Sequence, residues 1–156
     1  MEDETEQTFK LFYLWLYSQK MVGEVGREHK GWLELAELFV FADKRGAPKL
    51  KNRIIDEIVA RNIQLRIVPV TVVPYVYANT LESSPLRKLL VDLVAWDIDV
   101  QSSNVFDTPQ SYTKDYLFDL VRAVDERPSP RNPTNAPYHK NICSYHEHDE
   151  EAGKTK

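Results

Sequence analysis

The sequence is poor in cysteine and in long apolar runs, and it has no net basic charge. A single cysteine among 156 residues excludes an internal disulfide and is typical of proteins from a reducing compartment. No apolar run is long enough to cross a bilayer. The acidic start of the sequence, Met1 to Gln7, lacks the basic and apolar regions of a signal peptide. We therefore expect a soluble, intracellular protein of the cytoplasm or nucleus with no membrane partner.

The lack of a net basic charge bears on nucleic-acid binding. The formal net charge is −4, whereas domains that neutralise nucleic-acid phosphates usually carry a basic surface. One basic cluster does occur, but acidic residues at Asp43, Asp56 and Glu57 interrupt it. The cluster consists of Lys44, Arg45, Lys49, Lys51 and Arg53. We expect a solvated helix face there and no nucleic-acid partner.

Catalytic signatures are missing as well. The sequence has no glycine-rich phosphate loop of the G-x-G-x-x-G or G-x-x-x-x-G-K-[ST] type. The carboxylate pairs Asp97/Asp99 and Glu147/Asp149 are best explained as helix-end charge and solvated tail, because acid–base catalysis needs a cleft that separates the two pKa values. We therefore expect no enzymatic activity, no small-molecule substrate and no catalytic residues.

Helical periodicity is what the sequence has in abundance. Apolar residues make up 42% of the chain, and they recur three and four residues apart, as on one face of an amphipathic helix. This spacing predicts helices over about 6–19, 32–45, 48–63, 84–99 and 111–126, with Ser84 and Ser111 as N-caps. In the last of these helices a buried stripe is expected from Tyr112, Tyr116, Leu117, Leu120, Val121 and Val124.

Two segments needed separate interpretation. Gly46 and Pro48 fit a helix end followed at once by a helix start, since glycine tolerates a left-handed backbone and proline suits the first helical turn.

Residues 64–80 are rich in β-branched side chains, as strands are. Pro69 and Pro74 disfavour a central strand, so a short helix is the preferred interpretation.

The predicted fold is all-α: one bundle-like domain of five or six helices over residues 4–126, followed by a flexible tail. The tail is predicted for 127–156 because Arg127 to Pro137 contains four prolines in eleven residues, which excludes a continuous helix or sheet ladder there.

The order of three helices resembles the second half of a BTB/POZ domain of the fungal type. The resemblance lies in Phe9-x2-Phe12-x2-Trp15-Leu16-Tyr17, in Leu38-Phe39-Val40-Phe41-Ala42-Asp43-Lys44, and in Pro48-Lys49-Leu50-Lys51-Asn52. It covers residues 8–63, and 64–126 resemble the helices that follow the domain in that family. The resemblance implies a non-enzymatic module for protein–protein interaction.

The strand-containing first half of a BTB/POZ domain has no counterpart in this sequence. We therefore expect either a fragment or a shortened family member, in which the family's usual homodimer is in doubt. The apolar face that the first half would cover should then find another partner. That partner is another protein, either a second copy of the chain or cullin-3.

The resemblance also suggests the alternative of a cullin-3 ubiquitin-ligase adaptor. Members of the family contact cullin-3 partly through a hydrophobic-x-acidic triplet, and three stretches within residues 22–37 fit that pattern. They are Val22-Gly23-Glu24, Trp32-Leu33-Glu34 and Leu35-Ala36-Glu37.

Four large apolar residues lie near the first loop: Tyr17, Met21, Val22 and Trp32. They are candidate anchors for a partner or, equally, residues that cover the core of a small domain.

A cluster of potential zinc ligands lies in the tail: His139, Cys143, His146 and His148. Thiolate and imidazole are the preferred ligands of Zn²⁺, but the spacing matches no standard zinc finger. We expect a solvated polar tail without metal. The alternative is a small zinc-binding or transcription-linked regulatory protein.

Overall fold

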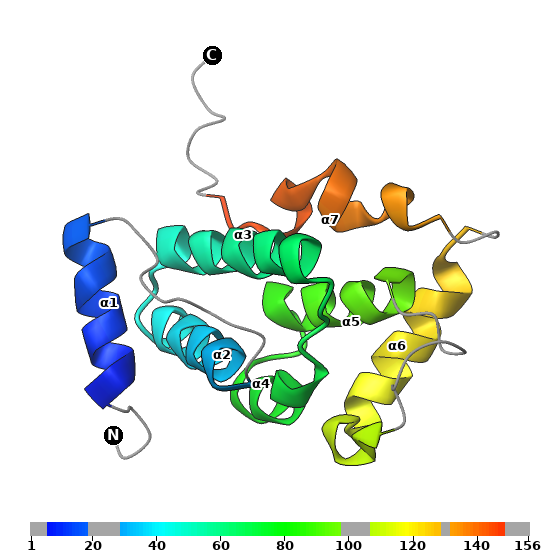
Figure 1. Ribbon diagram of the computed structural model, residues 1–156, viewed down its shortest axis with the longest axis horizontal. Coiled ribbons are helices and arrows are strands. Elements are labelled where there is room, and N and C mark those ends of the chain that lie inside the picture. Colours follow the sequence, from blue (N-terminus) through cyan, green and yellow to red (C-terminus); the bar gives the residue numbers. More distant parts are fainter. Residues whose placement is uncertain (1–5, 19–28, 98–106, 129–131, 149–156) are drawn as a thin grey trace.

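The structure is a computed structural model that describes residues 6–18, 29–97, 107–128 and 132–148. All regular secondary structure in these ranges is helical, which confirms the all-α prediction (Figure 1). The α-helices are α1 (Glu6–Ser18), α2 (His29–Lys44), α3 (Pro48–Leu65), α4 (Val73–Asn79), α5 (Pro85–Asp97), α6 (Lys114–Glu126) and α7 (Pro137–Lys140). Short 3₁₀ segments are η1 (Val70–Val72), η3 (Pro109–Ser111), η4 (Pro133–Asn135) and η5 (Ile142–Tyr145).

The core forms around α2, which packs against α1, α3 and α4. Phe39 on α2 and Leu50 and Ile54 on α3 are fully buried. Burying each such side chain contributes about 1.5–3 kcal/mol. The second part of the core lies on α5, which packs against α4 and α6. The helices α1 and α6 therefore lie at opposite ends of the long axis of the molecule (Figure 1).

The turn between α2 and α3 has the predicted geometry. Gly46 has a φ of 60°, in the left-handed region that only glycine adopts without steric cost. The amide of Ala47 donates to the carbonyl of Ala42 at 2.9 Å, and the amide of Gly46 donates to Asp43 at 3.2 Å. These two bonds form a Schellman motif, which pairs carbonyls that the end of α2 would otherwise leave without donors.

Residues 64–80 contain a short helix and no strand, as preferred, with Pro69 directly before η1 and Pro74 in the first turn of α4. The C-terminal carbonyls of α4 are capped by a side chain from α5. Arg87 donates to the carbonyl of Tyr77 at 2.8 Å and to the hydroxyl of Thr80 at 3.0 Å. This guanidinium thereby joins α4 to α5.

The helix starts partly differ from the predicted caps. The helix α5 begins at Pro85 as expected, but the Ser84 hydroxyl is buried and has no hydrogen-bond partner among the described residues. The cap of α6 is Thr113 rather than Ser111, since the Thr113 hydroxyl accepts from the amide of Tyr116 at 3.3 Å. Ser111 lies in η3 instead.

The stripe predicted to be buried on α6 is mostly uncovered. Tyr116 alone of its six residues is buried, and its hydroxyl donates to the carbonyl of Leu90 at 3.0 Å. Leu117, Val121 and Val124 are exposed. The prediction was wrong for these three residues. Among the described helices, the main contacts of α6 are with α4 and α5, and no described helix covers its outer apolar residues.

Part of the predicted flexible tail, residues 132–148, is packed against the helices and is called the C-terminal segment here, while residues 129–131 and 149–156 lie outside the described residues. The C-terminal segment contains η4, α7 and η5, and it packs onto α3 and α5. Ala136, Tyr138 and Tyr145 are buried. The proline-rich composition does exclude a long helix, but these side chains supply enough buried surface to hold short turns against the helices.

Candidate functional site

Two tyrosine hydroxyls attach the C-terminal segment to α5. The Tyr145 hydroxyl donates to the Asp92 carboxylate at 2.6 Å, and the Tyr138 hydroxyl donates to Asp97. Burial raises the pKa of the Asp92 carboxyl, while the hydrogen bond from Tyr145 and the charge of Lys88 partly oppose that rise. The Tyr145 phenol has a raised pKa because it is buried and donates to Asp92, so it stays protonated as a donor.

A buried lysine attaches the same segment to α3. Lys51 was predicted to lie on a solvated face, yet it is only 5% exposed. Its ammonium donates to Asp43 at 2.5 Å and to Glu147. Burial alone would lower the pKa of Lys51, but the bonds to these two carboxylates outweigh it and raise the pKa. The Asn52 side chain adds two bonds to the backbone of Glu147, at 2.8 and 2.9 Å.

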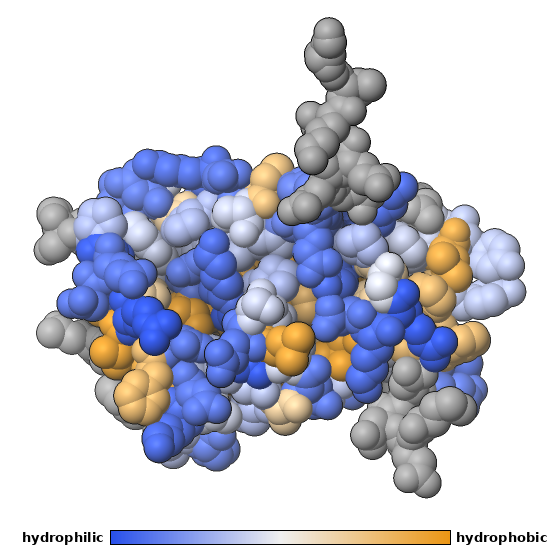
Figure 2. Space-filling model, turned by 180° about the vertical axis from the view of Figure 1, so that it is seen from behind, coloured by the Kyte–Doolittle hydropathy of each residue, from blue (hydrophilic) through white to orange (hydrophobic). Residues whose placement is uncertain are grey.

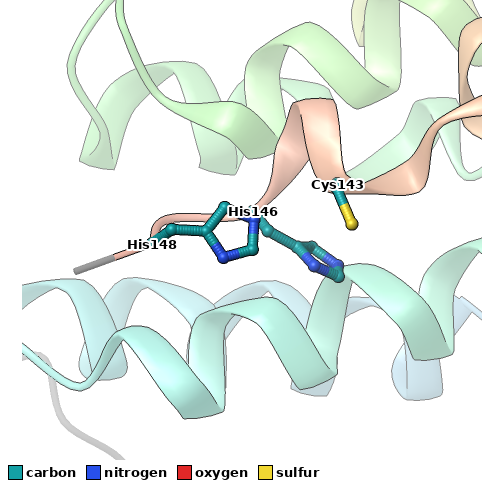
Figure 3. A group of neighbouring side chains, drawn as sticks. All are labelled: Cys143, His146 and His148. Carbon is teal, nitrogen blue, oxygen red and sulfur yellow. The ribbon is translucent and has the colours of Figure 1, made fainter. Parts of the chain in front are cut away.

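Beside this attachment, three of the four predicted metal ligands come together. Cys143, His146 and His148 each offer one ligand atom, and these atoms lie within 4.8 Å of one another. Figure 3 shows both imidazole rings on the side of the C-terminal segment that faces α3, with the Cys143 sulfur next to the His146 ring. His139, the fourth predicted ligand, lies on α7 and does not belong to this cluster.

The His146 ring is held in place by a carboxylate on α3. Its Nε2 atom lies 2.8 Å from Oδ1 of Asp56, and its side chain is 13% exposed. Cys143 and His148 are exposed. Sequence reasoning missed Asp56, since a residue 90 positions away in the sequence leaves no local signal.

A second candidate site is a column of aromatic rings on the outer side of α1. Phe9, Tyr13 and Tyr17 follow each other four residues apart and are 53%, 51% and 75% exposed. The ring centroids of Phe9 and Tyr13 are 6.3 Å apart and those of Tyr13 and Tyr17 are 4.6 Å apart. The two tyrosine hydroxyls are hydrogen-bonded at 3.0 Å. The four-residue spacing was visible in the sequence and indicates this column.

Apolar side chains also gather elsewhere on the surface. The rear face of the molecule carries them toward both ends, in the regions of α1 and α6 (Figure 2). On α1 the exposed Leu14 and Leu16 accompany the aromatic column, and on α6 the exposed group includes Phe118 and Val121.

The candidate anchors around the first loop divide between surface and core. Tyr17 is exposed, whereas Trp32 is 3% exposed and packs in the core. Met21 and Val22 lie outside the described residues. The triplets Trp32–Glu34 and Leu35–Glu37 both lie within α2, and Val22–Glu24 lies outside the described residues, so the adaptor role stays a prediction.

The groove between α5 and α6 has a volume of about 350 Å³ and is lined by charges of both signs. Several of these charges already have structural roles. Arg87 caps α4, Asp92 accepts from Tyr145, and Asp119 accepts from Tyr77 at 2.8 Å. These pairings account for Arg87, Asp92 and Asp119 by their role in the fold, and the three residues form no nucleophile–base pair. Asp99 and Asp149 of the predicted carboxylate pairs lie outside the described residues.

Comparisons of the chain with protein-family models, with curated proteins and with solved structures found no match. The resemblance to the second half of a BTB/POZ domain therefore stays a prediction from the sequence. Within the part of the chain that the structure describes, no helix combines the length and apolar character needed to cross a membrane.

Proposed function

We propose that this chain is a non-enzymatic protein–protein interaction module that binds a second copy of itself through the outer face of α1. We define this face as Phe9, Tyr13, Leu16 and Tyr17. The observation that carries the proposal is the exposed aromatic column, three rings in succession on one helix. The proposal agrees with the interaction role that the BTB/POZ resemblance implies.

The composition of α1 is that of a helix covered on two sides. Its inner side, with Trp15, is buried against α2, while its outer side is also apolar. A helix that is apolar nearly all round is typical of a buried position. Only two charged residues, Glu6 and Lys10, occur on it, and they pair with each other at 2.7 Å.

The helix α6 is a weaker candidate because it carries six charged residues, against two on α1. They are Lys114, Asp115, Asp119, Arg122, Asp125 and Glu126. The cores of protein interfaces are depleted of charge and enriched in tyrosine and phenylalanine. This difference favours α1 as the binding face.

A second copy suits this face because the face is nearly neutral. Two copies can approach without repulsion between like charges, and most homo-oligomers are twofold dimers in which the same patch meets itself. The three rings leave on the order of 350 Å² to be covered per copy, given 150–250 Å² for each buried aromatic side chain. A standard interface covers about 800 Å² per partner, so we expect weak, reversible association.

Sedimentation velocity over a range of protein concentrations tests the proposal. The wild type should shift from monomer to dimer as its concentration rises. Tyr13→Glu should weaken dimerisation by more than about tenfold, since a charge placed at the centre of the face would lose its hydration. Phe118→Glu on α6 is the matched control and should dimerise like the wild type.

Two results would contradict the proposal. One is a wild type that stays monomeric up to the highest soluble concentration. The other is loss of the dimer in Phe118→Glu with its retention in Tyr13→Glu. The cullin-3 adaptor role is the alternative that the resemblance suggests, and a binding assay with purified cullin-3 is its separate test.

A further inference from the structure

Cys143, His146 and His148 form a compact group of nitrogen and sulfur ligands that the α1 face does not involve. They come from a six-residue stretch in which η5 ends at Tyr145 and the chain then becomes extended at His146, with φ −95° and ψ 145°. This bend lets residues three and five positions after Cys143 present their rings next to its thiol (Figure 3). Thiolate and imidazole in one place favour zinc among common divalent ions.

The spacing of the ligand atoms fits a zinc ion after small side-chain rotations. Zinc lies about 2.3 Å from sulfur and about 2.0–2.1 Å from nitrogen in a tetrahedral site, so the ligand atoms must approach within roughly 3.3–3.7 Å of each other. Here they lie within 4.8 Å. Cys143 and His148 are exposed, so no packed neighbour has to move when they close on the ion.

Asp56 supplies the support that metal-binding histidines usually have. It lies at 2.8 Å from Nε2 of His146, which leaves Nδ1 as the nitrogen for the metal. A carboxylate bonded to the second ring nitrogen fixes the orientation of such a histidine and makes it a better ligand. One thiolate and one nearby carboxylate also balance the double charge of the ion. Glu147 is already paired with Lys51 and is therefore not a zinc ligand. A water molecule from solvent fills the fourth coordination position of the ion.

We propose that Cys143, His146 and His148 bind one zinc ion, with Asp56 as the positioning residue. All three ligands belong to the C-terminal segment, and the contact between His146 and Asp56 links the bound ion to α3 beside the Lys51–Glu147 pair. Zinc should therefore raise the melting temperature of the protein, because it binds the folded arrangement, in which Asp56 orients His146, more tightly than the unfolded chain.

Calorimetric titration of the reduced, metal-free protein with zinc tests the site. The wild type should bind one equivalent. Asp56→Asn should weaken binding by about tenfold to a hundredfold, the usual effect of removing such a support. Cys143→Ala, His146→Ala and His148→Ala should weaken it at least as much. His139→Ala is the matched control, because this exposed histidine lies outside the cluster, and it should bind like the wild type.

Cobalt(II) gives a second readout that depends on the ligands themselves. The wild-type complex should show a thiolate-to-cobalt charge-transfer band, and Cys143→Ala should lack it while keeping the circular dichroism of the folded protein. The proposal is overturned if the wild type binds no zinc at micromolar concentration. It is equally overturned if His139→Ala weakens binding as strongly as His146→Ala does.

Discussion

Removing the Tyr145 hydroxyl tests how the C-terminal segment is attached. The Tyr145→Phe variant keeps the buried ring but removes the donor that lies 2.6 Å from the Asp92 carboxylate. Tyr145 is fully buried, so no solvent water replaces the lost donor without rearrangement. The Asp92 carboxylate is left with an unsatisfied acceptor in a partly buried place.

The loss should depend on pH. A hydrogen bond to a charged group contributes about 1.5–3 kcal/mol, whereas one between neutral groups contributes about 0.5–1.5 kcal/mol. Burial raises the pKa of Asp92 above its ordinary value of 3.8, and the Tyr145 bond opposes that rise. The variant therefore has an even higher Asp92 pKa.

The sign follows from proton linkage. Consider a carboxyl whose pKa is higher in the folded than in the unfolded protein. As the pH rises above the unfolded-state pKa, the free energy of unfolding falls, because the folded protein still holds a proton that the unfolded protein has lost. The variant raises this pKa further, so its deficit relative to the wild type should grow between about pH 4 and about pH 7. At neutral pH, a deficit of about 1.5–3 kcal/mol corresponds to a melting temperature lower by roughly 3–12 °C.

Urea unfolding followed by tryptophan fluorescence at both pH values measures the deficit. Tyr112→Phe is the matched control, because it removes the same atom from a residue whose hydroxyl has no hydrogen-bond partner among the described residues, and it should lower stability by less than about 0.5 kcal/mol. The reasoning is refuted if Tyr145→Phe is as stable as the wild type at neutral pH, or if its deficit is equally large under acid conditions.

Two further substitutions test local features of the fold. Gly46→Ala should lower the free energy of unfolding by about 1–2 kcal/mol, because φ at position 46 is 60° and a left-handed backbone is strained for any residue with a Cβ atom. Nothing lies within 4 Å of the added methyl group, so the cost comes from the backbone alone. An unchanged melting temperature in thermal unfolding would contradict this. Arg87→Met should lower the free energy of unfolding by about 1.5–3 kcal/mol, because it removes the hydrogen bonds to Tyr77 and Thr80. If urea unfolding shows no loss of stability, these bonds do not hold α4 in place.

The sequence was sufficient to predict the helices because their apolar periodicity is local. The predicted helix over 48–63 corresponds to α3 at Pro48–Leu65, and Gly46 marks the turn before it. Such signals need only neighbouring residues. The same periodicity does not reveal whether an apolar face is covered, and for that reason Val121 and Leu117 were expected to be buried although they are exposed.

The attachment of the C-terminal segment depends on contacts that are distant in sequence. Tyr138 and Tyr145 meet aspartates 41 and 53 positions earlier, and no local pattern announces such pairs. For the metal cluster, composition was enough to nominate four residues. Only the folded arrangement separates His139 from the other three and adds Asp56 as the partner of His146.

The claim that α1 is the binding face is tested most directly by site-specific cross-linking. Cysteines are placed singly at the exposed Lys10, which lies on α1 at the edge of the face, or at the exposed Leu81 between α4 and α5, each with Cys143→Ser. If two copies meet through α1, a short bismaleimide should convert Lys10→Cys into a covalent dimer and leave Leu81→Cys monomeric. Equal cross-linking of both variants, or none of either, would contradict the account.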